Sequence, residues 1–138
     1  MVCGASPEAL DALSRFGEHI GVVFQLSDDV IDIASDTSGK RPGTDLREGV
    51  LTLPTLLVAA SDDPADARLR DLIARPLSDE GEVAEALGLL RSHAALREAR
   101  AEIARRAEAA RAALAPLPQG HAREALAALC DQVVTRSM

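Results

Sequence analysis

Residues 21–32 read GVVFQLSDDVID, and this stretch decides the fold and the chemistry that we expect of the 138-residue chain. Successive residues of an α-helix are turned by about 100°, so a helix here gathers its polar side chains on one face roughly 100° wide. These side chains are Gln25, Asp28, Asp29 and Asp32. The apolar residues Val23, Leu26 and Val30 point to the other side. The stretch therefore predicts an amphipathic helix with a carboxylate-bearing face.

Three carboxylates on one helical face repel one another, and like charges one turn apart destabilise a helix by roughly 0.2–0.5 kcal/mol. A divalent cation would remove this repulsion. Hard oxygen ligands suit Mg²⁺, which is usually bound by one or two carboxylates together with substrate phosphates. The alternative is a solvated acidic face that binds nothing. The aspartates alone leave both interpretations open.

A loop rich in turn residues follows the acidic helix, and residues 35–45 read SDTSGKRPGTD. Lys40 and Arg41 supply positive charge, and the glycines beside them let the backbone bend. Cations and backbone N–H groups beside a metal site form a pocket that fits a diphosphate. A basic loop that only neutralises an acidic helix is the alternative, and the residues by themselves do not separate the two.

The rest of the chain also indicates helices. The first one begins at Ser6-Pro7, since Ser is a favoured cap and Pro fits the first helical position, and it runs to about Ala34. Further helices are expected over residues 50–60 with Pro54 near the start, from 61–64 to before Pro76, from a Ser78 cap to Arg91, over 94–114, and after Gly120. We therefore predict an all-α helical bundle of about six helices, forming a single domain over residues 1–138.

The composition excludes several classes of protein. The net charge of −7 argues against a broad nucleic-acid-binding face. No apolar run approaches the ~20 residues that span a bilayer, so no membrane span is expected. Two cysteines are too few for a disulfide framework, which favours a cytoplasmic protein with free thiols.

Three motifs in order along the chain resemble the C-terminal half of the trans-polyprenyl diphosphate synthases. They are Phe24-Gln25-x-x-Asp28-Asp29-x-x-Asp32, then Gly39-Lys40-x-x-Gly43-Thr44-Asp45, then Gly49-x-x-Thr52-Leu53-Pro54. The resemblance covers essentially the whole chain and implies the C-terminal part of an isoprenoid-synthase fold. It also implies a prenyltransferase of isoprenoid biosynthesis, which condenses an allylic diphosphate with isopentenyl diphosphate and depends on Mg²⁺.

The same resemblance implies a role for each candidate residue. The residues that match the second aspartate-rich motif, and so the metal ligands, are Asp28, Asp29 and Asp32. Lys40 and Gln25 match groups beside the substrate diphosphate and the reacting carbon, and Phe24 would form part of the wall. Lys40, Gln25 and Phe24 are therefore the expected catalytic residues, and Asp45 is expected to order the loop around Lys40.

Two departures from the family pattern limit this expectation. The first aspartate-rich motif has no counterpart in the chain, and Gly49-Val50 stands where many family members have Gly-Lys. We therefore expect the chain alone to be inactive and to require the missing N-terminal half or self-association. The alternatives are a class I terpene cyclase and a non-catalytic helical fragment that serves in interaction or binds Mg²⁺ and diphosphate.

Overall fold

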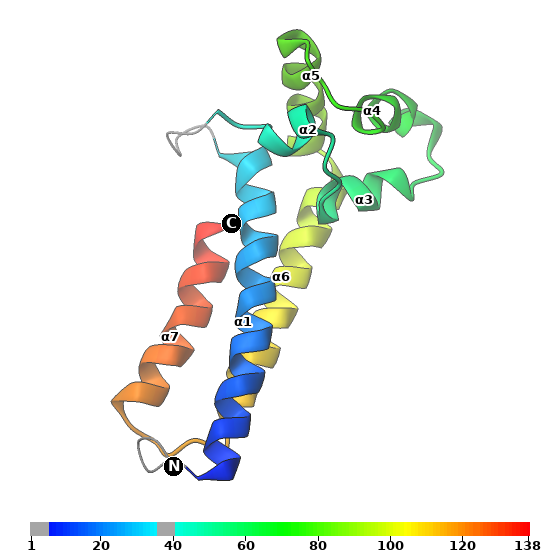
Figure 1. Cartoon of the computed structure of the whole chain (residues 1–138). Coiled ribbons are helices and arrows are strands. Elements are labelled where there is room, and N and C mark those ends of the chain that lie inside the picture. The colour runs from blue at the N-terminus through cyan, green and yellow to red at the C-terminus, as the bar shows by residue number, and fades with distance from the viewer. Residues whose placement is uncertain (1–5, 36–40) are drawn as a thin grey trace. The chain divides into compact units, whose positions relative to one another are not determined.

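The computed structural model describes residues 6–35 and 41–138, and every regular element in them is helical. The elements in chain order are α1 (Pro7–Ala34), α2 (Thr44–Glu48), α3 (Leu53–Ala59), the 3₁₀ turn η2 (Pro64–Asp66), α4 (Ala67–Ile73), α5 (Glu80–Arg91), α6 (Ala94–Ala113) and α7 (His121–Arg136) (Figure 1). The prediction of an all-α fold is confirmed. In these residues no helix has both the length and the apolar character that crossing a membrane would demand.

The chain divides into two compact units. Met1–Ser27 and Ala101–Met138 form the first, and Asp28–Arg100 forms the second. Helices α1 and α6 each contribute residues to both units. The expectation of a single domain stays a prediction.

The first unit is built on a buried stripe along α1. Ser6 begins this helix as expected, because its Oγ accepts the backbone N–H of Ala9 at 3.1 Å. The buried apolar residues of the unit recur every three or four positions and are Ala12, Phe16, Ile20 and Val23 on α1, Ile103, Ala107 and Ala110 on α6, and Cys130 and Val133 on α7. This spacing keeps one side of each helix against the core.

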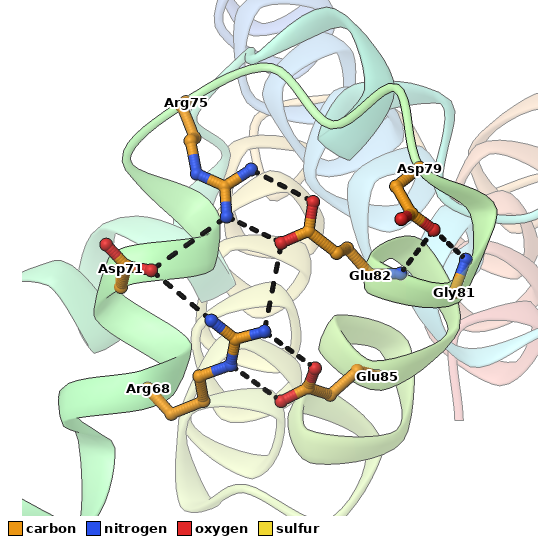
Figure 2. Close-up of polar contacts among 7 residues, drawn as sticks. All are labelled: Arg68, Asp71, Arg75, Asp79, Gly81, Glu82 and Glu85. Atoms are coloured by element: carbon orange, nitrogen blue, oxygen red, sulfur yellow. Dashed lines mark hydrogen bonds and ion pairs between the residues drawn. The ribbon is translucent and has the colours of Figure 1, made fainter.

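The second unit packs α4 against α5 through buried leucines and a layer of surface charges. Leu69 and Leu72 of α4 and Leu87 and Leu90 of α5 are all at most 5% exposed. Above them, Arg68 donates to both carboxylate oxygens of Glu85 at 2.8 and 2.9 Å, and Arg75 lies 2.6 Å from Glu82 (Figure 2). These ion pairs are exposed and therefore screened by solvent, so the buried leucines carry most of the stability of this unit.

Two details of the helix assignment were wrong. Asp79, not Ser78, caps α5, since its Oδ1 accepts the N–H groups of Gly81 at 2.7 Å and Glu82 at 3.4 Å (Figure 2). A carboxylate at this position also matches the positive end of the helix dipole. The second difference is α2, which begins inside the stretch expected to be loop. Helix α1 and the position of Pro54 at the start of α3 are as expected.

Candidate functional site at the end of helix α1

Helix α1 carries its polar residues on one face, as the sequence predicted. Val23 and Val30 are fully buried, whereas Gln25 and Asp28 are exposed and Asp29 is half-buried. Asp32, one turn further on, is also half-buried. The last turns of α1 therefore present carboxylates away from the core.

Asp32 is bound to the beginning of α2. The backbone N–H of Thr44 donates to its Oδ1 and the backbone N–H of Asp45 donates to its Oδ2, both at 3.1 Å. The N–H of Gly43 also donates to the Asp32 carbonyl oxygen at 2.9 Å. A carboxylate that accepts the first N–H groups of a helix satisfies donors that the helix cannot pair and opposes the dipole charge. Asp32 therefore orders the segment that follows the loop.

Helix α2 is short and depends on its flanking glycines. Gly43 (φ 87°) and Gly49 (φ 72°) both adopt the left-handed conformation that side chains disfavour. Leu46 is 4% exposed, and its carbonyl oxygen accepts the N–H of Leu77 at 3.1 Å. Sequence reasoning missed this helix, although the pair of glycines six positions apart was a usable signal for its ends.

The carboxyl of Asp45 is affected by the other negatively charged side chains near the end of α1. The pKa of its carboxyl is raised to about 6, first by burial and then by the negative charges of Asp32, Asp29 and Glu48, in that order of effect. A hydrogen bond with Asp32 contributes in the same direction. A carboxyl whose pKa is raised in this way marks a place where an added positive charge would be stabilised.

Of the basic residues in and after the loop, Arg41 and Arg47 are paired with an acidic residue of α5. Lys40 lies outside the described residues. Arg41 forms an ion pair with Glu80 of α5. Arg47 contacts the same carboxylate at 3.0 Å and donates to the Pro42 carbonyl oxygen at 2.8 Å. Arg41 therefore neutralises an acidic residue of α5, and Arg47 fixes the turn before α2.

Phe24 and Gln25 lie one turn before Asp28. The Phe24 ring is 37% exposed, and the guanidinium carbon of Arg136 lies 5.1 Å from its centroid. Gly21, a turn earlier, leaves room beside this surface, because a Cβ there would meet no other atom of the described residues within 4 Å.

The carboxylates at the end of α1 are hard oxygen donors of the kind that Mg²⁺ binds. Within the part of the chain that the structure describes, no three carboxylate, histidine or cysteine side chains are arranged as a complete metal site. Both oxygens of Asp32 accept backbone N–H groups, and Asp28 and Asp29 lie one turn earlier on the same face of α1. Mg²⁺ usually takes one or two protein carboxylates and completes its shell with phosphates and water, so these residues fit the ion.

The polyprenyl synthetase family matches residues 1–90, which is more than half of the chain. The chain belongs to the polyprenyl synthetase family. It is 49% identical to the nonaprenyl diphosphate synthase of Mycobacterium tuberculosis, over 99% of this chain and 41% of that protein. The family membership predicted from the three motifs is confirmed.

Solved structures of polyprenyl synthetases share the fold. A geranylgeranyl pyrophosphate synthase of Corynebacterium glutamicum, complexed with calcium and isoprenyl diphosphate, matches with a TM-score of 0.90 and 44% identity over 97% of this chain and 42% of that one. A structure from the same species, complexed with isoprenyl diphosphate and magnesium, matches with a TM-score of 0.80 and 29% identity over 96% and 39%. The chain thus spans about two fifths of the length of these relatives.

Proposed function

We propose that the chain supplies the second aspartate-rich motif of a prenyltransferase that condenses an allylic diphosphate with isopentenyl diphosphate. The observation that carries this proposal is the carboxylate cluster at the end of α1, in which Asp28 and Asp29 precede an Asp32 that holds the start of α2. The family membership supports it, and so do the related structures that are complexed with a divalent metal and isoprenyl diphosphate.

In this proposal Asp28 and Asp29 would hold Mg²⁺, and Asp32 acts mainly by fixing the start of α2. This division assigns Asp32 a more structural role than its motif implies, because both of its carboxylate oxygens accept backbone N–H groups. Lys40 contacts the substrate diphosphate from the loop before α2. Asp45, half-buried near other carboxylates, orders the loop and adds negative charge that favours binding of the cation.

The reaction begins as the bond between the allylic carbon and the diphosphate breaks. Mg²⁺, when bound, neutralises the negative charge that develops on the leaving diphosphate. Lys40 stabilises the same charge from the loop. Gln25 and the exposed face of Phe24 stand beside the allylic cation, which isopentenyl diphosphate attacks before a proton is lost. The residues of this chain thus bind the leaving group and shape the wall of the site.

The partners follow from this chemistry. The substrates are an allylic diphosphate and isopentenyl diphosphate. The first aspartate-rich motif would come from another polypeptide segment, because this sequence contains only one such motif. We also propose a cytoplasmic location, as expected from the cysteine content.

The test is a product assay with labelled isopentenyl diphosphate, a geranyl or farnesyl diphosphate primer, and Mg²⁺. The chain is assayed alone and together with the part of the M. tuberculosis nonaprenyl diphosphate synthase that it does not match. We expect no product from the chain alone, extended product from the mixture, and loss of that product with Asp28→Ala. A folded mixture that forms a stable complex without making product contradicts the proposal and favours a non-catalytic module. A cyclic hydrocarbon product would indicate a terpene cyclase.

A further inference from the structure

The last residue of α7 contacts a single turn of α1. Arg136 Nε donates to the Ser27 Oγ at 3.0 Å, and its Nη2 donates to the Phe24 carbonyl oxygen at 3.4 Å. Its guanidinium also lies over the Phe24 ring, with 5.1 Å between the guanidinium carbon and the ring centroid. One side chain therefore makes two hydrogen bonds and a cation–π contact with residues 24–27, all within the first unit.

Each contact has a physical reason. Ser27 is fully buried in the apolar stripe of α1, and a buried hydroxyl needs a hydrogen-bond partner. The Phe24 carbonyl is the helical acceptor for the N–H of Asp28, four residues on, and its second lone pair is available to Arg136. Arginine suits this position because its planar fork can hydrogen-bond at its edge while its face lies on an aromatic ring.

We propose that Arg136 is a positioning residue, which fixes the Phe24 ring and the turn of α1 between Phe24 and Asp28. This inference rests on the proposed function, since it is that function which places Phe24 and Gln25 at the wall beside the allylic carbon. Arg136 acts through Phe24 and Ser27, so its effect falls on the reacting carbon more than on the diphosphate.

We call the contacts of Arg136 with Phe24 and Ser27 the clamp, and fluorine NMR tests whether it exists. The chain contains two phenylalanines, and Phe16 is 5% exposed, so labelling with meta-fluorophenylalanine gives two resonances that a Phe24→Leu spectrum assigns. Arg136→Met keeps the apolar stem but removes the charge and both donors. We expect it to shift and sharpen the Phe24 resonance and to leave that of Phe16 in place. Arg105→Met, which removes an exposed arginine of α6 in the same unit, should move neither.

Kinetics in the two-part mixture test the positioning role. We expect Arg136→Met to lower kcat by about tenfold, since small displacements beside a reacting atom are costly, and to change the primer KM by less than about twofold. Arg136→Lys keeps the positive charge over the ring but loses the fork, and should recover part of kcat. Circular dichroism melts of each variant exclude unfolding as the cause.

The outcomes separate this inference from the proposed function. An unchanged Phe24 resonance in a folded Arg136→Met chain overturns the clamp. A shifted resonance with an unchanged kcat overturns the positioning role. If the wild-type mixture makes no product, the proposed function fails, and the positioning role for that reaction fails with it, while the fluorine spectra still decide whether the clamp exists.

Discussion

Among single residues, Asp32 is the one whose role differs most from what its motif suggests. Its two oxygens accept the N–H groups that begin α2. We predict that Asp32→Ala lowers the free energy of unfolding by about 1–2 kcal/mol, as the loss of a helix cap does, and that Asp32→Asn costs less because one acceptor oxygen remains. Urea denaturation measures both. Asp79→Ala, which removes the cap of α5, is the matched control and should cost about 1 kcal/mol without weakening Mg²⁺-dependent diphosphate binding. An Asp32→Ala chain as stable as the wild type would contradict this role.

Asp45 gives the chain a pH dependence of known sign. Its carboxyl pKa is raised from 3.8 to about 6, so the folded state binds this proton more tightly than the unfolded state and loses stability as the pH rises through that window. Asp45→Asn copies the protonated form. We predict similar melting temperatures for the two chains near the lower end of the window. Near neutral pH without Mg²⁺ the variant should be more stable, by about 1 kcal/mol after solvent screening. If the wild-type chain and Asp45→Asn were equally stable at both ends of the window, the pKa of the Asp45 carboxyl would not be raised in the folded state.

At the level of the elements, the ends of α2 depend on glycine. A Cβ on Gly49 would lie 2.8 Å from the Cγ of Pro76, and the φ of 72° already disfavours a side chain. We predict that Gly49→Ala destabilises the chain by about 1–3 kcal/mol. Gly17→Ala on α1 is the matched control, because its Cβ meets no atom of the described residues within 4 Å, and it should stabilise the chain by roughly 0.5–1 kcal/mol. Thermal melts measure both variants. A lower melting temperature for Gly49→Ala and a higher one for Gly17→Ala would confirm that α2 needs glycine at this end. An unchanged melting temperature for Gly49→Ala would contradict it.

The sequence predicted the elements whose determinants are local. The limits of α1 followed from Ser6-Pro7 and the apolar period, and the carboxylate face followed from the same period. Helix α2 was missed because five residues are too few to show a period and because Asp32 holds its start from twelve residues away. The contact of Arg136 with Ser27, 109 residues apart in the chain, depends on tertiary packing that no local pattern contains.

At the scale of the whole chain, α1 carries exposed apolar side chains on one of its faces. Leu10, Leu13 and Phe24 share this face at helical spacing and are 46%, 41% and 37% exposed. Exposed apolar side chains on one helix face favour association. We predict that sedimentation shows concentration-dependent self-association of the chain, and that Leu10→Glu with Leu13→Glu abolishes it while the helical content is retained. A wild-type chain that stays monomeric at all concentrations would contradict the prediction.

We propose that Asp28 and Asp29 hold a diphosphate through Mg²⁺, and phosphorus NMR of pyrophosphate tests this on the chain itself. We predict that the chain shifts and broadens the pyrophosphate resonance in the presence of Mg²⁺ and not in its absence. Asp28→Asn with Asp29→Asn should abolish the effect, whereas Asp62→Asn, an exposed aspartate of the second unit, should preserve it. Binding that needs no Mg²⁺, or that survives the loss of both carboxylates, would contradict the account.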